Sequence, residues 1–248
     1  MEALRVSLVG ASGRMGQAVQ ACARRHPELY ALVGMPRRGD DWAAAFAYCD
    51  VVIDFSLPET TGALIDAVVA TKKPLVIGTT GHDAAAKGQL AQTANEIPLL
   101  IAANFSVGVN ALFWLARQAA GVLGPDFDLE VLEMHHRAKK DSPSGTARRL
   151  VEILAEARQF EMTRDVRHGR VGDVGPRGAK EIGVHSVRGG DMVGEHTVLF
   201  AGMGERLELT HRASNRETFA AGALRAALWL AGRKPGRIYD MEDVLGLR

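Results

Sequence analysis

Cysteine is scarce in this sequence. Among its 248 residues only Cys22 and Cys49 are cysteines, and they lie far apart without a CxxC pair. This spacing argues against a disulfide framework and against a cysteine-ligated zinc site. We therefore expect a protein of a reducing compartment that binds no metal.

The chain also lacks an excess of charge and a long apolar run. Its 30 basic and 29 acidic residues are interspersed and give a formal net charge of +1. This balance argues against a nucleic-acid partner and against a membrane-surface patch. No segment reaches the roughly 18 uninterrupted apolar residues that cross a bilayer, and no secretory signal is recognisable at the start. We expect a cytoplasmic protein whose partners are small molecules, with no nucleic acid and no membrane among them.

The sequence does contain enough apolar material, 47% of its residues, for one large or two modest domains. In its first part, short apolar strands alternate with amphipathic helices, the pattern of βαβ units around a parallel sheet. We predict strands over residues 4–9, 30–33, 51–55, 74–78 and 98–102, and helices over residues 14–25, 59–70 and 83–95.

The pattern changes after Asn104. Helices over 107–123 and 145–158 flank a strand over 128–134, and a Gly/Arg-rich stretch follows at 167–180. A flexible linker is the default interpretation of that stretch, and a mobile loop near the active site is the alternative. Strands over 181–188, 195–201 and 206–211 are joined by glycine turns, which predicts antiparallel hairpins in a second, mixed α+β domain. Periodicity does not assign the last helix, 217–231, to either domain.

A glycine turn, Gly10-Ala-Ser-Gly13-Arg-Met-Gly16, joins the first strand to the first helix. In such a turn the first glycine permits a tight bend, the second lets the backbone approach a pyrophosphate, and the third lets the helix pack on the strand. A plain strand-to-helix turn is the alternative, but the βαβ units behind it favour a dinucleotide site. Gly78-Thr-Thr-Gly81 and Ala102-Ala-Asn-Phe105 end later strands at the same edge of the sheet, where ligands bind in such folds.

The end of the second strand bears on the choice of cofactor. An acidic residue there binds the ribose hydroxyls of NAD, but here Arg37 and Arg38 come before the first acid, Asp40. Guanidinium groups suit a 2′-phosphate. We therefore predict that NADPH is favoured and that NADH is possible, with two merely solvated arginines as the alternative.

The segment from Glu133 to Ala147 holds two adjacent histidines, three cations and a Ser-Gly-Thr turn at the start of a helix. Strand alternation places His135 on the face of Val131 and Glu133, and His136 on the opposite face. The helix start and Lys139 could bind the two ends of a dicarboxylate, and an imidazole can supply a proton near neutral pH. Simple N-capping is the plainer interpretation of Ser144, Gly145 and Thr146, and both can hold. Metal binding is disfavoured because the histidines are adjacent.

The pattern Glu133-x-His-His-Arg-x-Lys-x-Asp-x-Pro-Ser-Gly-Thr-Ala147 resembles the signature of the dihydrodipicolinate reductase family of lysine biosynthesis. Five further motifs of the sequence agree with that family. They are Gly10-Ala-x-Gly-Arg-Met-Gly16, Val52-Ile-Asp-Phe55, Gly78-Thr-Thr-Gly81, Asn104-Phe-Ser-Val-Gly-Val-Asn110 and Arg188-x-Gly-Asp-x-Val-Gly-Glu-His196, and the closing Tyr239-Asp-Met-x-Asp-Val-Leu245 also fits. The resemblance covers essentially the whole chain.

The resemblance implies a Rossmann-like nucleotide domain made of residues 1–106 and 216–248. A central substrate domain, residues 107–215, would close on it through hinges near Phe105-Ser106 and Asn215-Arg216. It also implies a homotetramer built through the central sheets, which the apolar alternation at 198–200 and 207–209 fits. The implied reaction is hydride transfer from NAD(P)H to a cyclic imine dicarboxylate, with loss of its 4-hydroxyl as water.

By the same resemblance, His135 is the general acid and Lys139 its cationic partner. His136, Ser144, Gly145 and Thr146 bind the substrate carboxylates. The cofactor residues are Gly10, Ala11, Ser12, Gly13, Arg14 and Met15 at the pyrophosphate, Gly78, Thr79, Thr80, Ala102, Ala103, Asn104 and Phe105 beside the nicotinamide, and Arg37 at the 2′-phosphate. The acidic ribose-binding residue of the family falls on Pro36 here, which agrees with the preference for NADPH.

Two other functions fit parts of the sequence. A different two-domain nicotinamide-dependent dehydrogenase would share the glycine turn but would leave the His-His to Ser-Gly-Thr segment unexplained. A redox-sensing NADP-binding regulator, in which the basic loop contacts a partner or nucleic acid, is disfavoured by the near-neutral charge.

Overall fold

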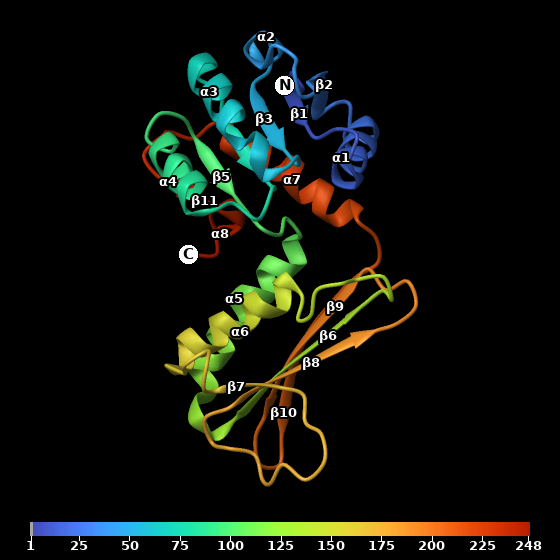
Figure 1. The fold of residues 1–248 in the computed structure, drawn as a ribbon, viewed down its shortest axis with the longest axis vertical. Helices are drawn as coiled ribbons and strands as arrows, with labels where there is room; N and C mark the ends of the chain where they lie inside the picture. The colour runs from blue at the N-terminus through green and yellow to red at the C-terminus, as the bar shows by residue number, and fades with distance from the viewer. Residues whose placement is uncertain (1) are drawn as a thin grey trace. The chain divides into compact units, whose positions relative to one another are not determined.

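The computed structural model describes residues 2–248. The chain forms two compact units, which are drawn together in Figure 1. Unit 1 contains the described residues up to Val107 together with Arg216–Arg248, and unit 2 is Gly108–Asn215. Each unit has its own sheet and its own hydrophobic core.

Unit 1 is built around a parallel sheet of six strands in the order β11-β5-β4-β3-β1-β2. Its strands are β1 (Leu4–Val9), β2 (Tyr30–Gly34), β3 (Val51–Asp54), β4 (Leu75–Ile77), β5 (Leu99–Ile101) and β11 (Ile238–Tyr239). Its helices are α1 (Arg14–Arg25), α2 (Trp42–Phe46), α3 (Thr61–Thr71), α4 (Ala84–Thr93), α7 (Glu217–Leu230) and α8 (Met241–Leu245), with a 3-10 turn at Pro58–Thr60. The predicted Rossmann-like parallel sheet is confirmed.

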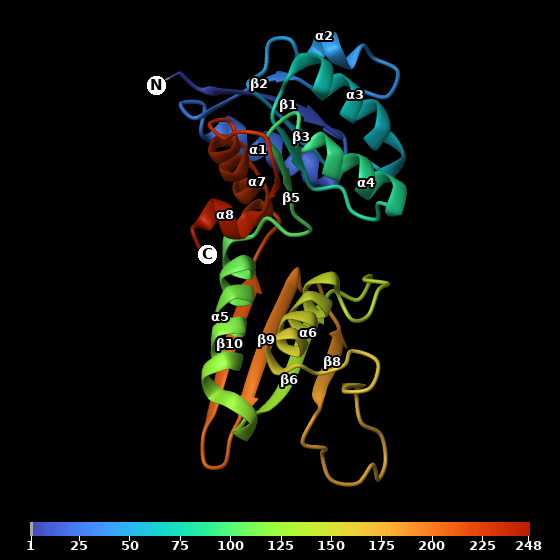
Figure 2. The same cartoon turned by 90° about the vertical axis from the view of Figure 1, so that its left-hand side faces the viewer.

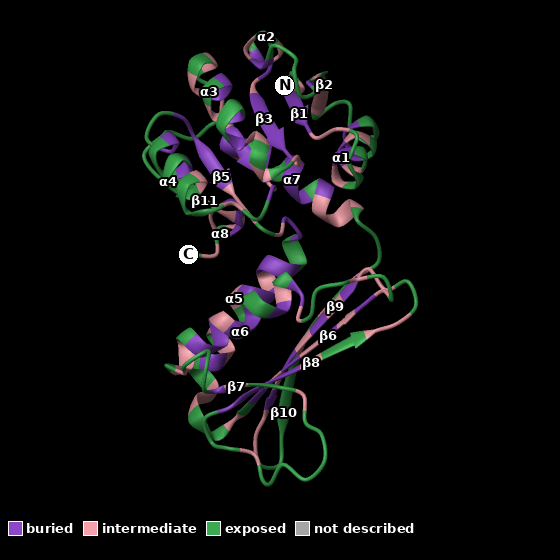
Figure 3. Ribbon diagram, viewed as in Figure 1, coloured by how far each residue is buried: buried purple, intermediate pink, exposed green. Residues whose placement is uncertain are grey.

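The sheet of unit 1 is covered on both faces, and its strands β3, β4 and β5 are apolar except for Asp54 at the end of β3. On β3, Val51 and Ile53 join the core under α1 and α7, whereas Val52 points to the core under α3 and α4. Figure 3 shows β3 buried along its length. Continuous apolar strands of this kind are what a doubly covered parallel sheet requires. The last long helix, α7, packs on α1 and therefore belongs to this unit.

Unit 2 is a mixed sheet of five strands in the order β10-β9-β6-β8-β7, with two long helices on one face. Its strands are β6 (Asp128–His135), β7 (Val166–His168), β8 (Ile182–Arg188), β9 (Gly194–Ala201) and β10 (Arg206–Ala213). Its helices are α5 (Val107–Leu123) and α6 (Gly145–Arg158), with a 3-10 turn at Gly124–Asp126. Figure 2 shows α5 and α6 alongside the sheet. The predicted mixed α+β fold is confirmed.

One predicted pairing in unit 2 is wrong. The glycine-rich turn at 189–191 suggested that β8 and β9 form a hairpin, but β6 lies between them, parallel to β8 and antiparallel to β9. The connection instead crosses the end of β6 and holds it, because the His136 amide donates to Met192 O at 2.7 Å and the Gly189 amide donates to His135 O at 3.0 Å. Turn residues alone do not distinguish a hairpin from such a crossing. The β9–β10 hairpin is present as predicted.

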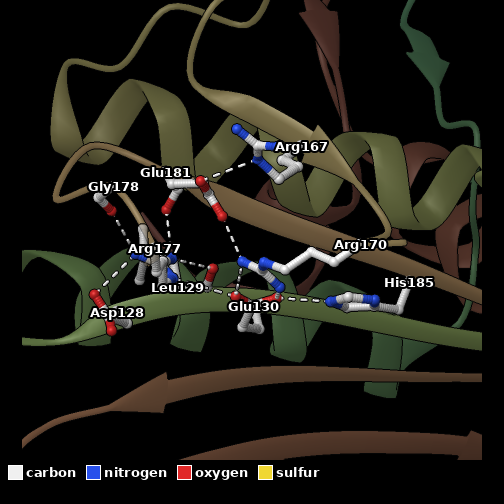
Figure 4. A network of polar contacts seen from close by, with 9 residues as sticks. All are labelled: Asp128, Leu129, Glu130, Arg167, Arg170, Arg177, Gly178, Glu181 and His185. Carbon is white, nitrogen blue, oxygen red and sulfur yellow. Dashed lines mark hydrogen bonds and ion pairs between the residues drawn. The ribbon is translucent and has the colours of Figure 1, made fainter. Parts of the chain in front are cut away.

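The Gly/Arg-rich stretch is anchored, contrary to the expectation of a flexible linker. It begins with the short edge strand β7, and two of its arginines reach back to the sheet. Arg170 and Arg177 both donate to Glu130 Oε1, at 2.9 and 3.3 Å, and His185 contacts the other oxygen of that carboxylate (Figure 4). This segment therefore forms part of the folded surface of unit 2.

Candidate functional site

The end of β6 places His135 on a buried carboxylate. Residues of β6 alternate in burial from Asp128 onward, so Val131, Glu133 and His135 all face inward. This is the alternation predicted from the sequence. Glu133 is 0% exposed and His135 is 7% exposed, and the imidazole Nδ1 lies 2.5 Å from Glu133 Oε2.

Glu133 is held ionised by several donors. Arg188 pairs with both carboxylate oxygens, at 2.8 and 2.7 Å, and the Ser144 amide donates to Oε1 at 3.1 Å. Burial raises the pKa of Glu133, but hydrogen bonds from Arg188 and its other partners outweigh burial and lower that pKa to about 2. The carboxylate is therefore a fixed negative charge beneath His135.

This contact selects the nitrogen of His135 that can deliver a proton. Because the ionised Glu133 only accepts, Nδ1 of His135 carries a hydrogen and Nε2 remains the exchanging atom. A Cβ at Gly194 would lie 2.9 Å from Nε2, so this glycine keeps space open beside that atom. Burial lowers the pKa of His135, and the hydrogen bond and charge of Glu133 oppose that shift.

His136 and Lys139 lie just beyond the strand. The His136 amide is bonded to the β8–β9 connection, and its side chain is half-buried. Lys139 Nζ pairs with Asp141 Oδ1 at 2.9 Å, and the lysine side chain is 21% exposed. The ammonium group has three donors, so Lys139 can bind a further carboxylate while it is paired with Asp141.

Ser144 caps helix α6, and its side chain serves the fold directly. Its hydroxyl accepts from the Ala147 amide at 3.1 Å and contacts His196 Nε2 at 2.9 Å, and the residue is 2% exposed. Gly145 is exposed, and a Cβ there would meet nothing within 4 Å. The two predicted roles therefore belong to different groups. The Ser144 side chain caps the helix, and the backbone around Gly145 and the half-buried Thr146 is open to an anion.

Two residues of this cluster, Arg188 and His196, were not predicted as site residues. In the sheet register, His135 is the partner of Arg188 on β8, and Glu133 is the partner of His196 on β9. The His196 ring packs edge-to-face on His135 with centroids 5.1 Å apart. Burial lowers the pKa of His196 to about 3, so this imidazole is neutral. A signal was available: alternation along β9 puts His196 on the face of the buried Val198 and Phe200.

The glycine turn of unit 1 has the geometry of a phosphate cradle. Gly10 has φ of +80°, and a Cβ there would lie 2.2 Å from Phe55 O. A Cβ at Gly16 would lie 2.2 Å from Gly10 O, so the helix packs on the turn only with glycine at this position. Gly13 is the N-cap residue of α1 and provides no side-chain hydrogen bond to the helix. The first amides of α1 therefore remain available to an anion.

The other residues of that glycine turn differ from one another in how far they are buried. Ser12, Gly13 and Arg14 are exposed, whereas Ala11 and Met15 are half-buried and pack on the core of unit 1. The exposed residues are those that could approach a pyrophosphate.

The predicted nicotinamide residues of unit 1 include several that are structural. Thr79 is buried, donates its hydroxyl to Asp54 Oδ2 at 2.7 Å, and accepts from the Ser56 amide at 3.0 Å. Burial raises the pKa of Asp54, and hydrogen bonds from the hydroxyls of Ser56 and Thr79 oppose that shift. Phe105 is 2% exposed and packs edge-to-face on Phe55.

The positions next to these residues remain open to a ligand. Thr80 and Ala103 are exposed, and Ala102 and Asn104 are half-buried. A Cβ at Gly78 would lie 2.1 Å from the Phe55 ring, so this glycine is needed for the aromatic packing. At the ends of β4 and β5, buried polar and aromatic side chains therefore stabilise the loops, and a few neighbouring positions are accessible to a ligand.

The segment after β2 presents both arginines to solvent, whereas Pro36 is buried. The Asp40 carboxylate accepts from the Arg37 amide at 2.7 Å and so shapes the loop. A groove of about 660 Å³ adjoins it, lined by Arg38, Asp40 and the helix residues Ala63 and Asp66. Arg38 rather than Arg37 lines this groove.

No helix within residues 2–248 is both long and apolar enough to cross a membrane. Over the same residues, no group of three or more His, Cys, Asp or Glu side chains is arranged to hold a metal ion.

Comparisons with known proteins point to the same family as the sequence motifs. Residues 4–105 match the family model "Dihydrodipicolinate reductase, N-terminus" and residues 108–245 match "Dihydrodipicolinate reductase, C-terminus". Proteins named 4-hydroxy-tetrahydrodipicolinate reductase from Akkermansia muciniphila and Alkalilimnicola ehrlichii are 56% and 48% identical to this chain, with 98% of this chain and 98% and 99% of theirs covered.

A solved structure shares the fold. Dipicolinate-bound dihydrodipicolinate reductase from Paenisporosarcina sp. TG-14 superposes with a TM-score of 0.78 at 24% identity, covering 97% of this chain and 99% of that one. The resemblance drawn from the sequence motifs is confirmed, and the chain belongs to the dihydrodipicolinate reductase family.

Proposed function

We propose that this protein reduces 4-hydroxy-tetrahydrodipicolinate, the compound in the names of its relatives, to tetrahydrodipicolinate in the diaminopimelate route to lysine. The observation that carries the proposal is the imidazole of His135, held at Nδ1 by the ionised Glu133. His135 lies at the end of β6, and Glu133 links it to the start of α6 at Gly145. An imidazole beside a helix start suits an anionic substrate that must also be protonated.

A nicotinamide nucleotide fits the glycine turn of unit 1. Gly10 and Gly16 allow the tight turn and the close packing of α1, because a Cβ at either position would collide with backbone atoms, and the uncapped start of α1 offers amides to the pyrophosphate. Gly10, Gly13 and Arg14 would hold the phosphates, and Thr80 and Ala103 would lie beside the nicotinamide. When bound, the cofactor supplies the hydride.

His135 supplies the proton that the reduced ring requires. In its charged form Nε2–H is the donor, while Glu133 retains the hydrogen on Nδ1 and stabilises the imidazolium. Lys139 and the backbone of Gly145 and Thr146 bind the substrate carboxylates, with His136 beside them. Binding of this dianion favours the protonated imidazole, because a negative charge nearby raises a histidine pKa.

We infer that NADPH is the preferred form of the cofactor. Support comes from the exposed Arg37 and Arg38 and from the absence of an acid at the position of Pro36. The ratio of kcat/KM for NADPH and NADH tests this preference, and the Arg37→Ala and Arg38→Ala variants identify the residue responsible. A ratio favouring NADH contradicts the inference.

We propose further that the protein is a homotetramer assembled through the sheet of unit 2. On the face away from α5 and α6, Leu132, Met134 and Leu199 are only half-buried. Val198 and Phe200, whose alternation suggested this surface in the sequence, are fully buried in the core instead. Sedimentation velocity measures the mass, and a monomeric mass would remove this part of the proposal.

A steady-state assay with the cyclic imine dicarboxylate and either cofactor tests the function. We expect turnover by the wild-type protein. His135→Gln should lower kcat by roughly 10²- to 10⁴-fold, because general acid catalysis contributes about that much, and Lys139→Ala should also raise KM. Wild-type kinetics in both variants would refute the assigned roles, and cofactor binding without turnover would favour a different dehydrogenase.

A further inference from the structure

A second pocket lies in unit 2, away from His135. It has a volume of about 460 Å³ and is bordered by the ends of α5 and α6, the start of β6 and the segment 177–181. Its apolar lining includes Phe127, Leu129 and Phe160. From Leu129 to His135 the strand extends about 20 Å at 3.3 Å per residue, so this pocket is separate from the candidate substrate site.

Arg158, at the end of α6, lines this pocket. Two of its three guanidinium nitrogens lack an acceptor in the described part of the chain. Its Nε and Nη2 atoms are buried and have no hydrogen-bond partner within residues 2–248. Burial lowers the pKa of this guanidinium, and only the charge of Asp126 opposes the shift. A buried donor without an acceptor destabilises a protein. Because the protein covers these two nitrogens, the Arg158 side chain must turn toward the pocket for an acceptor from outside the unit to reach them.

The acids of the pocket are already paired. Asp128 accepts from Arg177 at 2.8 Å, and Glu181 accepts from Arg167 at 3.2 Å and also pairs with Arg170 (Figure 4). Arg177 further donates to Leu129 O at 2.9 Å, so its donors are engaged as well. Arg158 is therefore the guanidinium of this pocket that is left to bind an anion.

We propose that this pocket is a second ligand site, which binds a small carboxylate with an apolar body. The planar guanidinium of Arg158 matches the geometry of a carboxylate, and the rings of Phe127 and Phe160 suit an apolar group. The volume falls within the roughly 300–1,000 Å³ of small-molecule sites. The same acceptor could come from a free metabolite or from an acidic side chain of a second copy, and we assign it to the free molecule.

Calorimetric titration of the full-length protein with benzoate tests the site, with benzamide as the uncharged control ligand. We expect the wild-type protein to bind benzoate but not benzamide, and Arg158→Gln to weaken benzoate binding at least about tenfold, as loss of a charge-assisted hydrogen bond predicts. Arg149→Gln makes the same change on the same helix at an exposed arginine paired with Glu152, and should bind normally. Arg158→Lys, which keeps the charge, should bind more weakly than the wild-type protein.

Several outcomes would overturn the assignment. Equal benzoate affinity in the wild-type protein and in a folded Arg158→Gln variant would show that Arg158 is not the receptor. Loss of binding in Lys139→Ala would place benzoate in the candidate substrate site. Absence of benzoate binding would also reject the site, and a lower sedimentation mass of Arg158→Gln would then identify a second copy as the source of the acceptor.

Discussion

At the scale of single residues, the ionised Glu133 determines what the end of β6 can do. It pairs with Arg188, holds His135 at Nδ1 and accepts from the Ser144 amide. One carboxylate therefore links the proposed proton donor to the start of the helix that would bind the substrate. A residue that positions the acid in this way should affect catalysis without contacting the substrate.

Replacing Glu133 separates this positioning role from simple stability. Glu133→Gln keeps the shape but removes the charge that favours imidazolium, so we expect kcat to fall by about 10- to 100-fold, on the scale of a lost charged hydrogen bond. Steady-state kinetics and urea unfolding measure the two effects. Glu130→Gln is the control, because Glu130 lies on the same strand and is also paired with arginine. A similar loss of kcat in both variants would show a structural role only.

The pH profile of kcat/KM reports the protonation of His135 in the free enzyme. Its pKa lies below the ordinary value of 6.5 because burial disfavours the charged form. Since the proposed acid must be protonated, kcat/KM should fall as the pH rises through this lowered pKa. In Glu133→Gln the fall should begin at lower pH, because the charge that supports imidazolium is gone. A profile that is flat from pH 5 to 8 would contradict this role of His135.

At the scale of elements, unit 1 depends on the close approach of α7. A Cβ at Gly222 would lie 1.8 Å from Phe105 O, so α7 reaches its place on the core only with glycine there. The connection between β8 and β9 has a comparable function in unit 2, because it holds the end of β6 through backbone hydrogen bonds. In both cases a local contact fixes an element on which the site depends.

Paired glycine substitutions test the approach of α7. Gly222→Ala should reduce the free energy of unfolding by about 1–3 kcal/mol, the usual range for overpacking. A Cβ at Gly88, an exposed position of α4, would meet nothing within 4 Å. Gly88→Ala should therefore raise the free energy of unfolding by about 0.5–1 kcal/mol, because alanine favours a helix. Urea denaturation measures both changes. A Gly222→Ala variant as stable as Gly88→Ala would show that α7 can shift without loss.

At the scale of the whole molecule, the buried histidine and carboxylate of unit 2 make the protein sensitive to acid. The pKa of His196 is lowered to about 3, so between pH 6.5 and 3 the unfolded chain binds a proton that the folded chain does not. Glu133, with its pKa lowered to about 2, adds the same effect below its ordinary 4.5. Stability is therefore present above these ordinary values and is lost as the pH falls.

Urea unfolding at a series of pH values tests this linkage. The wild-type protein should lose stability steadily from pH 6.5 to pH 4, by up to roughly 1.4 kcal/mol for each pH unit per group. His196→Gln should show a smaller slope, because glutamine does not titrate while it can still bond to Ser144. Equal slopes in the two proteins would show that His196 is not the source of the acid sensitivity.

Much of the fold could be predicted from local sequence. Apolar strands alternating with helices indicated the parallel sheet of unit 1, and the period of β6 placed His135 inward. The short elements α2, β7, β11 and α8 were missed, because a few residues carry too weak a periodic signal. The supposed β8–β9 hairpin was wrong because a turn does not specify which strand is its neighbour.

The candidate site was predicted less completely than the fold. The proposed donor His135, the cation Lys139 and the helix start at Gly145 lie in one short segment of the sequence, so a single motif indicated them together. Arg188 and His196 come from two other strands, and only the sheet register brings them to Glu133 and His135. Local pattern carries no information about pairing across that distance in the chain.

Local sequence specifies the chemical groups and their order along the chain: a glycine turn before a helix, and a histidine that alternates with a glutamate before a capped helix. Which groups are ionised and which atoms are free depends on contacts between residues that are distant in the chain. The tertiary fold buries Glu133 against Arg188, leaves Nε2 of His135 as the exchanging nitrogen, and leaves two nitrogens of Arg158 without an acceptor among residues 2–248. The physical reason is that burial and hydrogen bonding set the charge state of a group, and both arise from residues distant in the chain.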